Sequence, residues 1–62
     1  MNWETKGTTK IYKGIKYVYA FDKVSDTTNM LMISSISTYG LRITFEVKDF
    51  QTAKNIVKEI EK

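Results

Sequence analysis

Apolar residues recur at about every second position over residues 8–22 and 30–47, which is the spacing of half-buried β-strands. Gly14 and Gly40 interrupt these two stretches at points where the chain can reverse, because glycine adopts positive φ without strain. Each stretch is therefore expected to form a β-hairpin. Residues 1–7 precede the first hairpin and are interpreted as an N-terminal tail or an extra strand.

In the first hairpin, a two-residue turn at Lys13 and Gly14 would pair Tyr12 with Ile15. Side chains alternate between the two faces of a strand, so this register assigns each residue to one face. One face would then carry Tyr12, Ile15, Tyr17, Tyr19 and Phe21.

In the second hairpin, a turn at Gly40 would pair Ile36 with Ile43 and would place the partner of Met32 at Val47. The two apolar sets would then share one face of the sheet. The opposite face would be half exposed and would carry Leu31, Ile33, Ile11 and Val18.

Residues 50–62 have the apolar spacing of an amphipathic helix. Phe50, Ala53, Val57 and Ile60 form its apolar stripe, and Asp49 precedes it as the expected N-cap. The fold class is therefore predicted to be α+β, with an antiparallel sheet of three to four strands in two hairpins. The C-terminal helix is expected to pack on one face, and residues 1–62 to form a single domain.

Composition narrows the ways in which so short a chain can become stable. With 62 residues the domain buries a small core, and with no cysteine and no histidine it lacks disulfides and the usual ligands of structural zinc. A dimer or a binding partner is therefore expected to matter more than usual. No apolar run approaches the length of a membrane span or a signal peptide, so we expect a cytoplasmic protein, of the producing or infected cell, with no membrane partner.

No motif of catalysis is present. Ser34, Ser35 and Ser37 lack the histidine that would activate a nucleophile, and no glycine-rich turn opens a helix to hold a phosphate. Asp22 and Asp26 flank one loop without the pattern of a calcium site. We therefore expect no enzyme activity, no metal and no cofactor.

Lysines and tyrosines alternate over residues 10–19, and the net charge is +3. Such a hairpin suits nucleic acid, with ammonium groups on phosphates and rings on bases, or a protein contact in which tyrosines supply the area. It is equally consistent with tyrosines at the edge of the core and lysines that keep the sheet from aggregating. The candidate binding residues are Lys10, Tyr12, Lys13, Lys16, Tyr39 and Arg42.

Residues 41–54, Leu-Arg-Ile-Thr-Phe-Glu-Val-Lys-Asp-Phe-Gln-Thr-Ala-Lys, resemble the strand and helix of the arm-site DNA-binding domains of phage integrases and of AP2-type domains. The arginine-rich strands of those domains are missing, so no residue's role is carried over. In kind, the chain resembles small phage and mobile-element accessory proteins of the anti-CRISPR type, which are short, rich in lysine, isoleucine and asparagine, and without catalytic motifs.

That resemblance implies a non-enzymatic, stoichiometric binding protein, a phage or prophage inhibitor of a host defence or nucleic-acid-handling protein. Its expected partner is a host protein or nucleoprotein complex. One alternative is a small basic domain that binds DNA or RNA through the first hairpin. A second is a homodimeric regulatory protein that associates through the half-exposed sheet face.

Overall fold

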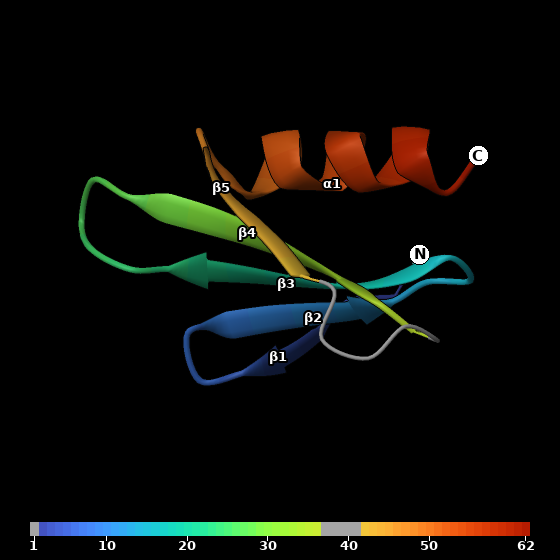
Figure 1. The fold of residues 1–62 in the computed structure, drawn as a ribbon. Coiled ribbons are helices and arrows are strands. Elements are labelled where there is room, and N and C mark those ends of the chain that lie inside the picture. The colour runs from blue at the N-terminus through green and yellow to red at the C-terminus, as the bar shows by residue number, and fades with distance from the viewer. Residues whose placement is uncertain (1, 37–41) are drawn as a thin grey trace.

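The structure, a computed structural model, describes residues 2–36 and 42–62. Its described part forms one antiparallel sheet with strand order β1-β2-β3-β4-β5 and a single helix on one face (Figure 1). The elements are β1 (Glu4–Lys6), β2 (Thr9–Lys13), β3 (Tyr17–Lys23), β4 (Asn29–Ser35), β5 (Arg42–Val47) and α1 (Phe50–Ile60).

The α+β class is confirmed, but the sheet has five strands and not three to four. The additional strand is β1, which pairs Glu4 with Ile11 and Lys6 with Thr9 of β2. Gly7 makes the reversal between these strands at a φ of 63°, a left-handed conformation that a residue with a Cβ adopts only with strain.

The first hairpin has a longer connection than predicted. Tyr12 pairs with Tyr19 and not with Ile15, so the predicted register was wrong by four residues. An even shift leaves every side chain on its predicted face, and the aromatic residues of β2 and β3 still share one side of the sheet. Ile15 is the exception, because it leaves the sheet in the turn and is 91% exposed.

The second hairpin has a register that reverses the predicted faces. Ile33 pairs with Ile43 and Leu31 pairs with Phe45, an odd shift from the expected pairing of Ile36 with Ile43. Leu31 and Ile33 therefore face the helix, and the two methionines of β4 occupy the opposite face. The predicted turn at Tyr39 and Gly40 lies outside the described residues.

The core lies between the sheet and α1, and the confirmed N-cap of the helix fixes where α1 begins. Asp49 Oδ1 accepts a 2.8 Å hydrogen bond from the Thr52 amide, which satisfies one of the free amides of the first helical turn. Leu31 and Val57 are completely buried, and each such side chain stabilises the fold by about 1.5–3 kcal/mol. The buried core residues are Tyr19, Phe21, Leu31, Val47, Ala53 and Val57.

Aromatic residues extend this core toward the first strands. Trp3, in the segment before β1, lies 5.4 Å from the Tyr12 ring and 5.1 Å from the Phe50 ring, centroid to centroid. The sole tryptophan thus closes one end of the core. No described helix or strand covers the opposite face of the sheet (Figure 1), and that face is where a functional site can lie.

Candidate functional site

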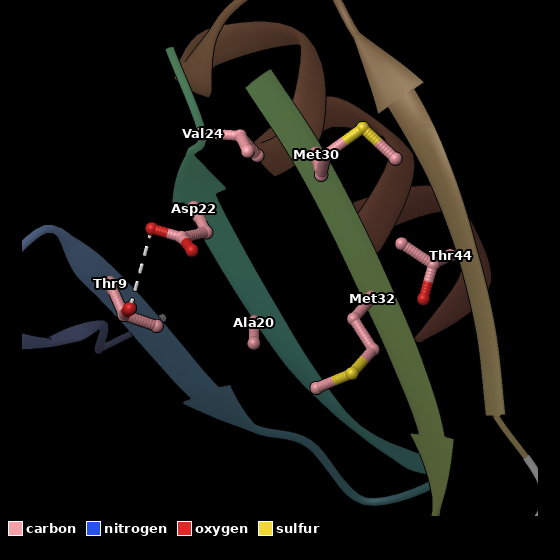
Figure 2. Close-up of a pocket in the computed structure, with 7 residues that line it drawn as sticks. All are labelled: Thr9, Ala20, Asp22, Val24, Met30, Met32 and Thr44. Atoms are coloured by element: carbon pink, nitrogen blue, oxygen red, sulfur yellow. Dashed lines mark hydrogen bonds between the residues drawn. The ribbon is translucent and has the colours of Figure 1, made fainter. Parts of the chain in front are cut away.

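A shallow hollow of about 390 Å³ lies on the uncovered face of the sheet. Figure 2 shows its lining side chains projecting from β2, β3, β4 and β5, with the helix behind the sheet. Most of the lining is apolar. The residues around it are Thr9, Ala20, Asp22, Val24, Met30, Met32 and Thr44.

The strand register explains why the hollow forms. Ala20 of β3 pairs with Met32 of β4, and Met32 pairs with Thr44 of β5. The short side chains of Ala20 and Thr44 leave space on both sides of the long methionine (Figure 2). Methionine is unbranched and adapts its shape to what it contacts, so this surface can accommodate a protruding apolar group.

Register also arranges charge on this face, which we call the open face, in three rows that run across the strands. The central row begins at Glu4 of β1, pairs Ile11 with Ala20 and continues through Met32 and Thr44 of the hollow. The row on one side is basic at both ends and consists of Lys13, Val18, Ser34 and Arg42. The row on the other side contains two acids and one lysine and consists of Lys6, Thr9, Asp22, Met30 and Glu46.

Asp22 is the charged residue of the hollow's lining. Its Oδ1 accepts hydrogen bonds from the hydroxyls of Thr8, at 3.2 Å, and Thr9, at 3.4 Å. These bonds fix the carboxylate at the rim of the hollow (Figure 2). It can therefore receive a cationic or hydrogen-bond-donating group from a partner whose apolar part rests on the methionines.

The turn between β2 and β3, which contains the candidate binding residue Lys16, is bound to the end of the helix. Lys16 donates from Nζ to the carbonyl oxygens of Ile60, at 3.1 Å, and Lys62, at 2.9 Å. Carbonyls at a helix C-terminus lack partners within the helix and carry the negative end of its dipole, so a lysine there is stabilising. The Lys16 ammonium thus has a structural role in this conformation.

Glu61 also holds this turn, through its side-chain carboxylate. Its carboxylate accepts hydrogen bonds from the amides of Ile15, at 2.8 Å, Lys16, at 3.2 Å, and Tyr17, at 3.2 Å. It also accepts one from the Tyr19 hydroxyl, at 2.6 Å. A carboxylate with these donors satisfies the turn's amides much as an anion is held by a cluster of backbone N–H groups.

These bonds shift the pKa values of both partners in opposite directions. Burial, followed by the hydrogen bond to Glu61, raises the pKa of Tyr19 well above its ordinary value. The hydrogen bond from the Tyr19 hydroxyl has the largest effect and lowers the pKa of Glu61. Desolvation opposes it, and the amides of the turn add smaller contributions that lower the pKa further. Both shifts favour a charged carboxylate and a neutral phenol, which is the pair that the hydrogen bond requires.

The remaining candidate residues lie apart from one another. Tyr12 is half-buried on the helix side, with its ring 6.0 Å from that of Tyr19. Lys10 lies on the same side, with its ammonium 5.3 Å from the Phe50 ring centroid. Lys13 and Arg42 are exposed at the two ends of the basic row on the open face, and Tyr39 lies outside the described residues.

The structure therefore separates the five described candidates, with Lys10, Tyr12 and Lys16 toward the helix and Lys13 and Arg42 on the open face. The candidates chosen from the sequence did not include the residues that line the hollow, of which Met30 and Met32 are the most important. The signal was present, because β4 has apolar side chains at both odd and even positions and one helix can cover only one of these sets. The prediction of a half-exposed face named Ile11 and Val18, which do lie on it, but also Leu31 and Ile33, which do not.

Residues 2–36 and 42–62 contain no group of three or more acidic residues that could hold a metal ion. No described helix is long and apolar enough to cross a membrane. Comparison with protein-family profiles, curated proteins and solved structures gave no significant match.

Proposed function

We propose that the protein is a non-enzymatic binding protein that captures a protein partner on the open face of its sheet. The observation that carries the proposal is the order of the three rows, with a deformable apolar hollow between a basic row and a row containing acids. Interfaces commonly combine an apolar centre with a polar rim in this way.

The rows specify the chemistry of that partner. An apolar side chain would rest on Met30 and Met32, in contact with the hollow. A carboxylate would approach Lys13 or Arg42, and a lysine or arginine would approach Asp22. Complementary charge across an interface speeds association and fixes orientation, so the two rows would also determine how the partner docks.

The partner class that we propose is a host defence or nucleic-acid-handling protein, with this chain as a phage or prophage inhibitor. Support for this narrower proposal comes from the chain's likeness in kind to anti-CRISPR and other mobile-element accessory proteins. A non-enzymatic binding protein acts by occupying a surface, so inhibition would be stoichiometric.

Direct binding of nucleic acid by the first hairpin has less support. Lys16 is engaged by the helix carbonyls, and Lys10 lies over Phe50. Tyr12 packs between Trp3 and Tyr19, and is not presented as a platform for bases. A protein partner fits the available surface better than a phosphate backbone does.

Affinity capture with matched variants tests the proposal. Met32→Glu places a charge in the centre of the open face, whereas Asn55→Glu places the same charge on the exposed side of α1. Proteins retained from host lysate by the parent and by Asn55→Glu, but lost with Met32→Glu, support the open face, provided circular dichroism shows all three folded. Equal retention by the three proteins contradicts it.

A mobility-shift assay at low salt separates the nucleic-acid alternative from the proposal. Binding of DNA or RNA that is lost with Lys13→Glu and weakens with added salt would favour that alternative. Absence of any shift, combined with one-to-one binding of a captured protein in calorimetry, would favour the proposal.

A further inference from the structure

The edge strand β5 presents a second surface that the open face does not account for. In the described part of the chain β5 pairs only with β4, so its outer edge offers unpaired amide and carbonyl groups. Residues 42, 43, 44 and 46 are exposed, and the strand contains neither proline nor lysine, two of the residues that often block an edge. Its charged residues are Arg42 and Glu46, which have opposite signs. Such an edge is suited to pairing with another strand.

Charge and register identify a second copy of the same strand as a match. At the outer edge of a strand, the outward-pointing amide and carbonyl groups belong to every second residue. The register of antiparallel pairing between β5 and its copy can therefore change only in steps of two residues. With Thr44 opposite Thr44 of the second copy, Arg42 lies opposite Glu46, and by symmetry this ion pair forms twice. A shift of two residues in one direction would instead place Arg42 opposite Lys48, which repels it.

The helix-facing side of β5 is complementary in the same register. Ile43 lies opposite Phe45 of the second copy, again twice. Ile43 is 59% exposed and Phe45 is half-buried in the single chain, so pairing removes apolar surface from water. Ile43 also lines a hollow of about 280 Å³ with Tyr17, Ile33 and Ile60, which lies beside this edge and can receive the copy's side chains.

We propose that β5 associates with β5 of a second copy in this register, joining the two sheets into one. The interface consists of one short strand from each copy, so the dimer is weak and reversible. It places two open faces side by side on the same side of the joined sheet. The inference does not depend on what the open face binds.

Sedimentation equilibrium over a concentration range up to about 1 mM tests the proposal with variants that reverse or exchange the charges of Arg42 and Glu46. The parent should dimerise as concentration rises. Arg42→Glu and Glu46→Arg, each alone, should weaken association about tenfold or more, because both ion pairs become repulsive contacts. The double variant R42E/E46R should restore dimerisation. A parent that remains monomeric throughout, or single variants that dimerise as the parent does, overturns the proposal.

Three further variants distinguish the edge from the open face. Thr44→Cys introduces the only cysteine of the chain at the symmetry axis, and oxidation should yield a disulfide-linked dimer, whereas Thr27→Cys in the exposed β3–β4 loop should yield much less. Met32→Glu should leave parental dimerisation intact. Loss of dimerisation with Met32→Glu, or equal crosslinking of the two cysteine variants, means that the copies meet elsewhere and overturns the edge pairing.

Discussion

The Tyr19 hydroxyl donates a 2.6 Å hydrogen bond to Oε2 of Glu61, joining the centre of β3 to the residue that follows α1. Tyr19 is completely buried as a residue, yet its hydroxyl reaches a carboxylate that also holds three amides of the β2–β3 turn. One carboxylate therefore connects the helix end, the turn and the core. In Figure 1 the β2–β3 turn lies at the same end of the molecule as the C-terminus.

Tyr19→Phe should destabilise the protein by about 1–2 kcal/mol, because it removes a charge-assisted hydrogen bond and keeps the ring in the core. Chemical denaturation followed by the fluorescence of Trp3 would measure the loss. In a double-mutant cycle with Glu61→Gln the two effects should be less than additive. Strict additivity would show that the two groups do not interact in solution.

The same pair predicts a stability plateau bounded on both sides by pH. The pKa of Glu61 is lowered on folding, so its contribution is present above its ordinary pKa of 4.5 and is lost as the pH falls through the lowered value. The pKa of Tyr19 is raised on folding, so its contribution is present below its ordinary pKa of 10.0 and is lost as the pH rises beyond it.

Melting temperatures from pH 2 to 11 check this plateau. Glu61→Gln should reduce the fall in melting temperature at low pH. Part of that fall should remain because of Asp49, whose pKa is also lowered, chiefly by its hydrogen bond with the Thr52 backbone. Asp49→Asn is the matched control, since asparagine also caps helices without titrating. An acid limb unchanged by Glu61→Gln would contradict the assigned role of this carboxylate.

Gly14→Ala should destabilise the parent but have little effect in a Glu61→Ala background. A Cβ at Gly14 would lie 2.5 Å from Glu61 Oε2. So close a contact would displace the carboxylate from the turn amides that donate hydrogen bonds to it. Once the carboxylate is absent, the obstruction is absent too. Thermal unfolding of the four proteins measures this coupling, and an equal loss in both backgrounds would assign the effect to the backbone of the turn.

The observed register of the second hairpin predicts unequal costs for two neighbouring residues. Leu31→Ala should cost about 2–5 kcal/mol, because Leu31 is completely buried and leaves a cavity. Met32→Ala should cost much less, since Met32 lines the open face and is half-buried. The register predicted from the sequence alone reverses this order, so urea denaturation of the two variants decides between them.

Local sequence signals were sufficient for the parts of the fold that depend on neighbouring residues. Asp49 was predicted as the helix cap, and Phe50, Ala53, Val57 and Ile60 as the apolar stripe, because both follow from spacing within one element. The aromatic face of the first hairpin survived an incorrect register because the error was even.

The choice of the sheet face that the helix covers and the role of Glu61 depended on contacts between segments that are distant in the sequence. In β4 both alternating sets of side chains are apolar, so the pattern could not choose which set the helix covers. Glu61 is separated from the turn by more than 40 residues, and in sequence it resembles any polar residue at the end of a surface helix. Its carboxylate holds the amides of the β2–β3 turn. The carbonyl oxygens of Ile60 and Lys62 bind the Lys16 ammonium, which looked free in the sequence because these partners are also more than 40 residues away.

Site-specific photocrosslinking in cells that contain the natural partner tests capture on the open face. A photoreactive phenylalanine analogue would replace Met32 on the open face or Asn55 on the outer side of α1. We expect a discrete covalent adduct with one partner protein from position 32 and none from position 55. Adducts from position 55 alone, or from neither position, would contradict capture on the open face.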